Sequence, residues 1–186
     1  MPRFKSDLGG RWAITLVSSA SINFTLCSFY GSIMDDPDPI DALCVELYSW
    51  PIPLIVCGDF NSRPIITFDG RKTAHRKPKV RFAMQRLGEE HNLVDVWDVK
   101  NLNLPGYTYY SAPHCKYTRI DYFFVSQALI STVRINVLPK VITDHNTLIL
   151  ELETRNQRPI RAKWTFEKAL LKDPEYIDSL KLRLLA

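Results

Sequence analysis

Several features of other protein classes are missing from this sequence of 186 residues. No stretch approaches the roughly 20 consecutive apolar residues that a membrane-spanning helix needs, so we expect no membrane association. The first ten residues, MPRFKSDLGG, contain no apolar run, which argues against a secretory signal. Hydrophobic residues make up 46% and charged residues 24%, which is the balance of an ordinary globular domain.

Cysteine is scarce, and its spacing matches no zinc motif. The sequence has four cysteines, Cys27, Cys44, Cys57 and Cys115, and none forms a CxxC pair. The first three lie in apolar segments, as buried free thiols do. We therefore expect free thiols, a reducing compartment and no zinc site.

The net charge is only +4, but one part of the chain is strongly basic. No acidic residue interrupts its basic side chains, which are Arg71, Lys72, Arg76, Lys77, Lys79, Arg81 and Arg86. Two interpretations remain open. The block could follow a nucleic-acid backbone, because each neutralised phosphate releases condensed counterions, or it could be a solvated loop without a partner.

The first half of the chain predicts strands around a helix. Segments 11–17 and 22–30, RWAITLV and INFTLCSFY, are rich in β-branched and aromatic residues and predict a hairpin. A helix is expected to begin with Asp38 as its N-cap, with apolar residues on one face at 40, 43, 44 and 47. Segment 53–60, PLIVCGDF, is almost continuously apolar, which is typical of a strand covered on both faces.

The second half repeats this alternation. It predicts a helix at 79–91, a short strand at 93–97, a long strand through YTRIDYFFVS at 117–126, a helical turn capped by Ser126 and a last strand at 146–153. Strands alternating with helices predict an α/β fold. We expect one domain over 1–154, followed over 155–186 by a basic linker and a final helix that begins at Asp173.

Polar side chains stand at the ends of three predicted strands. They are Asp59 and Asn61 in GDFN, Asp121 in RIDY, and Asp144 and His145 in TDH. Taken singly, each has a structural explanation: an Asx turn at Asp59, an ion pair of Asp121 with Arg119, and a structural histidine beside a turn. Together they form the set that phosphodiester hydrolysis requires, namely oxygen ligands for a divalent cation and groups that activate water.

These segments resemble the motifs of a known family. GDFN, RIDY and TDH are similar to the GDFN, (S/K)-(R/K)-ID and SDH motifs of the endonuclease/exonuclease/phosphatase superfamily, which includes DNase I. The run YTYYSAPHCKYTRIDYFFVS at 107–126 resembles the endonuclease of LINE-type (non-LTR) retrotransposons. KWTF at 163–166, with the following ALLKDPEYI, resembles the connector to its reverse transcriptase. The resemblance extends from about Gly10 to the end of the chain.

The resemblance implies a DNase I-like four-layer α/β sandwich, in which two packed mixed sheets are flanked by helices. It also implies an endonuclease that uses Mg²⁺ or Mn²⁺, and no small-molecule cofactor, to nick DNA for target-primed reverse transcription. Asp59 would help to deprotonate water, and Asn61 would hold the phosphate. His145, oriented by Asp144, would contact a phosphate oxygen. Asp121 would join the carboxylate cluster, and Asp144 would also bind the metal. The implied DNA contacts are Tyr30, Arg63, Thr108, Ser111, His114 and Arg119.

Members of that family begin with a strand ending in asparagine and a strand that carries a metal-binding glutamate. The segment before Arg11 is far too short for either strand, so we expect a bare sheet edge, weak metal binding and impaired nicking. Glu46 is not expected to replace the glutamate. Two other functions remain open, an inactive remnant that binds nucleic acid and an inositol phosphate or phospholipid phosphodiesterase. The expected partners are DNA and a reverse transcriptase domain, in the nucleus and cytoplasm.

Overall fold

The computed structural model describes residues 3–18, 22–63, 77–101, 104–139 and 143–153, together with Pro174, Ile177 and Asp178. The chain divides into two compact units, 1–155 and 156–186. The first part of the basic block, at 71–76, and the predicted linker at 155–173 lie outside the described residues. Among the helices of the described part, none is long and apolar enough to cross a membrane.

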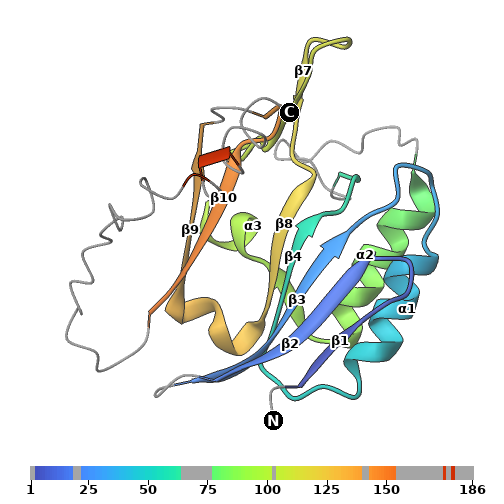
Figure 1. Ribbon diagram of the computed structural model, residues 1–186, viewed down its shortest axis with the longest axis vertical. Coiled ribbons are helices and arrows are strands. Elements are labelled where there is room, and N and C mark those ends of the chain that lie inside the picture. Colours follow the sequence, from blue (N-terminus) through green and yellow to red (C-terminus); the bar gives the residue numbers. More distant parts are fainter. Residues whose placement is uncertain are drawn as a thin grey trace. The chain divides into compact units, whose positions relative to one another are not determined.

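A six-stranded mixed sheet forms the centre of the first unit (Figure 1). In spatial order its strands are β1 (Phe4–Ser6), β2 (Trp12–Ser18), β3 (Asn23–Tyr30), β4 (Leu54–Asp59), β8 (Asp121–Ser126) and β5 (Leu93–Asp95). β3 and β4 are parallel, and the other neighbours are antiparallel. The predicted hairpin of β2 and β3 and the predicted buried strand β4 are therefore confirmed.

β1 covers part of the edge of β2 that we expected to be bare, and β1 is itself the edge strand of the sheet. It pairs with β2 in antiparallel register, from Phe4 opposite Thr15 to Ser6 opposite Ala13. Next to it, the Lys5 ammonium group lies 2.6 Å from the carboxylate of Glu46, which also accepts a hydrogen bond from the Trp50 indole. Glu46 therefore links its own helix, which spans Asp38–Leu47, to this edge strand.

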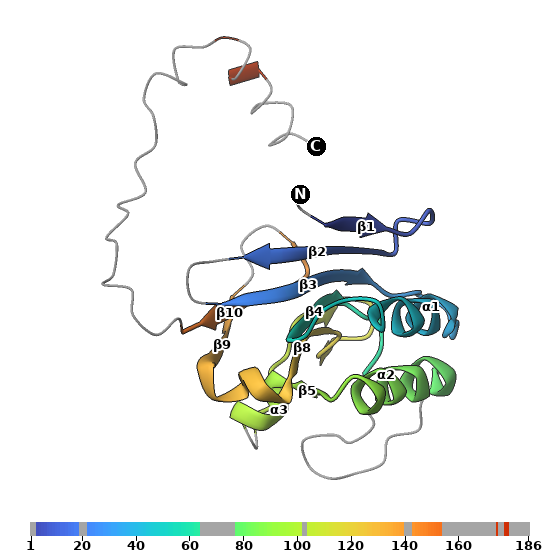
Figure 2. The same ribbon diagram turned by 90° about the horizontal axis from the view of Figure 1, so that it is seen from below.

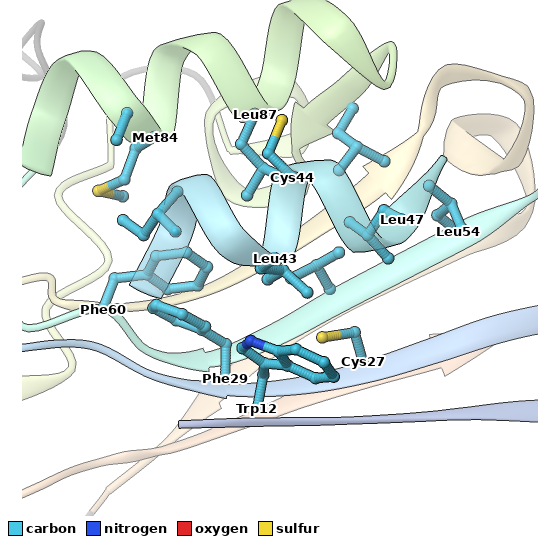
Figure 3. Packing of buried hydrophobic residues seen from close by; sticks show 14 of the residues in the cluster. Trp12, Cys27, Phe29, Leu43, Cys44, Leu47, Leu54, Phe60, Met84 and Leu87 are labelled. Atoms are coloured by element: carbon cyan, nitrogen blue, oxygen red, sulfur yellow. The ribbon is translucent and has the colours of Figure 1, made fainter. Parts of the chain in front are cut away.

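Two helices, α1 (Asp38–Leu47) and α2 (Pro78–Glu90), cover one face of the sheet (Figure 2). The predicted apolar face of α1 packs into the core, where the Phe29 and Phe60 ring centroids lie 4.7 Å apart (Figure 3). The predicted N-cap is wrong by one residue. Pro37 occupies that position, and Asp36 accepts a hydrogen bond from the Asp38 amide at 3.1 Å.

The other face of the sheet packs against β9 (Val133–Leu138) and β10 (Thr147–Leu152), which form an antiparallel pair. α3 (Val96–Lys100) and a short 3₁₀ helix (Gln127–Thr132) border the same core. The strand predicted at 93–97 ends early, because Asp95 accepts a hydrogen bond from the Trp97 amide at 3.0 Å and caps α3. Sheet packed on sheet with helices outside is the α/β architecture that the sequence predicts.

The long strand predicted at 117–126 is divided in two. Its first part, β7 (Lys116–Thr118), forms a hairpin with β6 (Tyr109–Ser111), and this hairpin extends beyond the beginning of β8 (Figure 1). At the break, the amides of Ile120 and Asp121 both donate to the Thr108 hydroxyl oxygen, at 3.1 Å each. The Thr108 hydroxyl therefore accepts hydrogen bonds that a neighbouring strand would otherwise accept, and it fixes the position where β8 begins.

Candidate active site

Three polar side chains form a row across the carboxyl end of β3 and β4 and the beginning of β8. Tyr30 is paired with Asp59 across β3 and β4, and Asp59 is paired with Asp121 across β4 and β8. Residues paired in this way place their side chains on the same face of a sheet. The sheet register therefore brings together two carboxylates that are 62 positions apart in the sequence.

His145 joins this row from the loop before β10. Its Nδ1 atom lies 2.9 Å from Oδ2 of Asp121, and its ring centroid lies 4.9 Å from that of Tyr109. The backbone of His145 forms a bridge with Tyr109, which anchors the loop to β6. Because an ionised carboxylate only accepts hydrogen bonds, Nδ1 carries the proton, and Nε2 remains for another partner.

The prediction that Asp144 orients His145 is wrong. Asp121 has this role, while the Asp144 side chain is exposed and its carbonyl accepts a hydrogen bond from the Tyr110 amide at 3.2 Å. The Asp144 carboxylate also lies outside the group of possible metal ligands that Asp59, Asp121 and His145 form. Its predicted place as a metal ligand does not fit this geometry.

The GDFN segment holds Asp59 and Asn61 through the geometry of its backbone. Oδ1 of Asp59 accepts a hydrogen bond from the Asn61 amide at 2.7 Å, so the predicted Asx turn is present. Asn61 adopts φ of 49°, and its side-chain amide donates to the Gly31 carbonyl at 3.1 Å. Gly58 has φ of 140°, and a Cβ atom there would lie 1.9 Å from the Phe29 carbonyl oxygen, so only glycine fits.

Lys77 supports the same loop, although sequence analysis did not assign it to the site. Its Nζ atom donates to the carbonyl of Asn61 at 2.8 Å and to that of Ser32 at 3.0 Å. Burial lowers the pKa of Lys77, an effect that the nearby Asp59 carboxylate opposes. No motif could reveal this role, because its acceptors are backbone carbonyls that any residue type supplies.

The electrostatics of the site favour a bound cation. Burial is the largest cause of a raised pKa at Asp59; the Asn61 amide opposes it, and the carboxylate of Asp121 adds to the rise. One ligand atom from each of Asp59, Asp121 and His145 lies within 4.8 Å of the other two. Two carboxylates this close repel each other, and a hard divalent cation with oxygen ligands would relieve the repulsion. The donor set therefore fits a divalent metal.

The residues predicted to contact DNA fall into two groups. Tyr30, Arg63 and His114 are exposed, and Ser111 is partly exposed. Tyr30 is in register with Asp59, and Arg63 follows Asn61 by two residues. Ser111 and His114 lie in and after β6, at the end of the hairpin. All four can be reached from solvent, so a contact with DNA remains a prediction for them.

Thr108 and Arg119 do not fit the predicted contact. Thr108 is fully buried, and its hydroxyl accepts the two amide hydrogen bonds at the start of β8. Arg119 is 7% exposed, and its guanidinium forms ion pairs with Asp95 and Asp98. Both side chains therefore position the backbone before Asp121 and lie away from solvent.

In the described part of the basic block, residues 77–86, several basic side chains make contacts within the protein. Lys77 binds two carbonyls, Arg81 is buried, and Arg86 forms an ion pair with Asp41. Lys79 is exposed at the start of α2. The arginines at 81 and 86 are thus used within the protein.

Comparisons with known proteins identify the family and the fold. The model of the Endonuclease/Exonuclease/phosphatase family matches residues 10–145. The chain is 28% identical over 133 residues, 69% of its length, to the Transposon TX1 uncharacterized 149 kDa protein of Xenopus laevis. It spans only 10% of the length of that relative.

Solved structures share the fold at lower sequence identity. The 3′ phosphatase NExo from Neisseria, bound to a product DNA hairpin, has a TM-score of 0.65 and 17% identity, covering 82% of this chain and 72% of its own. The endonuclease domain of TRAS1, a telomere-specific non-LTR retrotransposon, has a TM-score of 0.56 and 17% identity, covering 83% and 70%. The AP endonuclease LMAP from Leishmania major has a TM-score of 0.55 and 20% identity, covering 75% and 53%. With a DNase I-like α/β fold and a family match over most of its length, the chain belongs to the endonuclease/exonuclease/phosphatase family.

Proposed function

We propose that this chain is the endonuclease domain of a LINE-type retrotransposon and that it nicks one strand of DNA with the help of Mg²⁺ or Mn²⁺. The observation that carries the proposal is the convergence of Asp59, Asp121 and His145, whose ligand atoms lie within 4.8 Å of one another. The similarity to a transposon protein and to the TRAS1 endonuclease fold supports the assignment to this branch of the family.

In the proposed reaction, the oxygen of a water molecule attacks phosphorus and the bond from phosphorus to the 3′ oxygen breaks. In the Asx turn, Oδ1 of Asp59 accepts the hydrogen bond of the Asn61 amide, which fixes the orientation of the carboxylate. This carboxylate would accept the proton of the attacking water. His145 would meet a phosphate oxygen through Nε2, while Asp121 holds the ring and stabilises its protonated form. Asn61 would help to hold the phosphate. The 3′ oxygen takes a proton from the protonated His145 or from solvent and leaves as a hydroxyl, which can prime reverse transcription.

The carboxylates of Asp59 and Asp121 are the groups that would hold the divalent cation. Nucleases of this family generally use divalent metals. When bound, such a cation would offset the negative charge that develops on the phosphate. Mg²⁺ and Mn²⁺ are the expected ions because carboxylate oxygens are their preferred ligands.

The hairpin of β6 and β7 is the proposed DNA contact beside the site. It carries Ser111 and leads from there to His114, while Tyr110 and the half-exposed Tyr117 lie with ring centroids 4.6 Å apart. Aromatic faces accept nucleotide bases without strong sequence preference. Tyr30 and Arg63 would contact the backbone from the opposite side of the row. A linked reverse transcriptase domain and a nuclear and cytoplasmic location are also parts of this proposal.

Incubation of the purified chain with supercoiled plasmid and Mg²⁺ tests the proposal. We expect conversion to the open circular form, slow because metal binding is predicted to be weak, no conversion in the presence of EDTA, and none by a variant carrying Asp59→Ala and His145→Ala. Nicked ends should be extended by a DNA polymerase, because they carry a 3′-hydroxyl. Plasmid that is bound but never nicked would instead favour the inactive nucleic-acid-binding interpretation.

A further inference from the structure

A second group of metal-ligand side chains lies between the carboxyl-terminal parts of α1 and α2. Cys44 belongs to α1, Glu90 is the last residue of α2, and His91 follows it. One ligand atom from each lies within 4.8 Å of the other two. The group shares no residue with the candidate active site, and it belongs to the helix-covered face of the sheet.

The hydrogen bonds within this group orient its side chains as metal ligands are oriented. The Cys44 thiol and the Tyr48 hydroxyl both donate to Oε2 of Glu90, at 3.1 and 3.0 Å. Nε2 of His91 lies 2.8 Å from the Cys44 carbonyl oxygen. Since a carbonyl oxygen only accepts, Nε2 carries the proton and Nδ1 keeps a lone pair. Histidines that bind metals are held in this way, with the second ring nitrogen donating to a carbonyl or carboxylate.

We propose that Cys44, Glu90 and His91 bind a borderline transition-metal cation of the Zn²⁺ class, with water as the fourth ligand. Thiolate and imidazole together favour Zn²⁺ over the Mg²⁺ expected at the carboxylate site. Bonds of about 2.0 to 2.3 Å place tetrahedral ligands about 3.3 to 3.8 Å apart. The observed separation of 3.1 Å between the Cys44 sulfur and the Glu90 oxygen is close to this range.

The proposed metal site is buried on one side and exposed to solvent on the other. Cys44 is 4% exposed and faces α2 beside Leu87 (Figure 3), whereas Glu90 is exposed and His91 is partly exposed. An ion can therefore enter past the end of α2. On metal binding, the Cys44 thiol loses its proton to solvent, and the sulfur forms a bond to the metal. Because the thiol must lose its proton to bind the ion, the affinity should increase with pH.

The spacing of the cysteines alone predicts no such site. The ligands come from three residue types, and Cys44 and Glu90 are 46 positions apart. Only the packing of α1 against α2, with their carboxyl-terminal parts side by side, brings them together. A bound ion would link these helices above the core that they share, and so raise the melting temperature.

A titration of the full chain with Co²⁺ under reducing conditions tests the site. Bound at a thiolate, Co²⁺ gives a near-ultraviolet charge-transfer band, so we expect this band at one equivalent and its disappearance when Zn²⁺ is added. Cys44→Ser should abolish the band. Cys115→Ser, which removes an exposed thiol elsewhere, and the pair Asp59→Asn with His145→Gln should preserve it.

Glu90→Gln and His91→Gln provide variants at less buried positions, in case Cys44→Ser does not fold. Each should weaken Co²⁺ binding by at least about tenfold while the thiolate band remains at saturation. The absence of a band in the wild-type chain, its persistence in Cys44→Ser, or its loss in Cys115→Ser would overturn the proposal. Because the active-site pair is varied separately, this result does not depend on nuclease activity.

Discussion

Nδ1 of His145 lies 2.9 Å from Oδ2 of Asp121, the first residue of a strand that begins 24 positions earlier in the chain. The contact fixes both the tautomer and the orientation of the imidazole. It also places the ring beside Asp59, which is the register partner of Asp121. A histidine that would otherwise belong to an exposed loop thereby becomes part of a three-residue site.

The first prediction concerns this contact. Asp121→Asn keeps the shape of the side chain but removes the charge that stabilises a protonated His145. We expect DNA nicking to fall by about 10²-fold or more. Asp144→Asn, the matched change at the exposed neighbouring carboxylate, should have a much smaller effect. Equal losses of the nicking rate in the two variants would show that the contact between His145 and Asp121 has no special role in nicking.

The second prediction concerns pH. Because the pKa of Asp59 is raised on folding, the folded chain binds more protons than the unfolded chain between the ordinary and the raised pKa values. Stability therefore falls as pH increases through that window. Asp59→Asn removes this effect and keeps an acceptor for the Asn61 amide, so its melting temperature should exceed that of the wild type at neutral pH. The difference should shrink below the ordinary pKa of aspartate; a constant difference would contradict the account.

The third prediction concerns the glycine of GDFN. Gly58→Ala forces a Cβ atom against the Phe29 carbonyl between two central strands, and we expect a loss of about 3 kcal/mol or more in the free energy of unfolding. Gly10→Ala is the control: its φ of 68° is also unfavourable for alanine, but no atom lies within 4 Å of the added Cβ. That change should cost about 1 to 2 kcal/mol. Urea denaturation of both variants distinguishes the clash from the backbone strain, and equal losses would argue against the clash.

The sequence predicted the central strands and helices because their apolar patterns are strong. β2, β3, β4, α1 and α2 all occur close to their predicted bounds. β9 was missed, since its VRINVL segment directly follows a helical turn and has no separate boundary signal. The break before Asp121 was also missed, because it depends on a hydroxyl that lies 13 positions away in sequence.

The candidate site was predicted in part for a similar reason. Strand-end motifs correctly identified Asp59, Asp121 and His145 as residues that converge. They did not show which carboxylate meets the imidazole, because Asp144 is adjacent in sequence and Asp121 is adjacent only in the fold. Arg119 has a basic side chain near a proposed DNA site, and only its burial beside Asp95 and Asp98 shows a structural role.

The fourth prediction separates structural from DNA-binding roles of arginine. Arg119→Ala leaves Asp95 and Asp98 without their shared partner, and we expect a loss of about 3 to 5 kcal/mol of stability. Arg63→Ala, at an exposed position, should change stability by about 0.5 kcal/mol or less and should instead weaken DNA binding. Chemical denaturation and DNA binding at two salt concentrations check both expectations. A stable Arg119→Ala variant with weakened DNA binding would support the original prediction that Arg119 contacts DNA.

The fifth prediction concerns the Thr108 hydroxyl. Thr108→Val has nearly the same shape but leaves the amides of Ile120 and Asp121 without an acceptor in a buried position. We expect a loss of about 1 to 3 kcal/mol in stability, together with reduced nicking because Asp121 is displaced. Thr108→Ser, which retains the hydroxyl, should stay closer to the wild type in both measurements. An equally large effect of Thr108→Ser would indicate that the methyl group, and not the hydroxyl, is important.

The central claim is that Asp59, Asp121 and His145 perform chemistry on a bound phosphate. Its most direct test is the single-turnover cleavage rate of a duplex oligonucleotide by the wild type and by Asp59→Asn, Asp121→Asn and His145→Gln, with DNA affinity measured in parallel. The account predicts that each variant cleaves at least about 10²-fold more slowly and binds DNA about as tightly as the wild type. Variants that bind DNA and cleave it at the wild-type rate would contradict it.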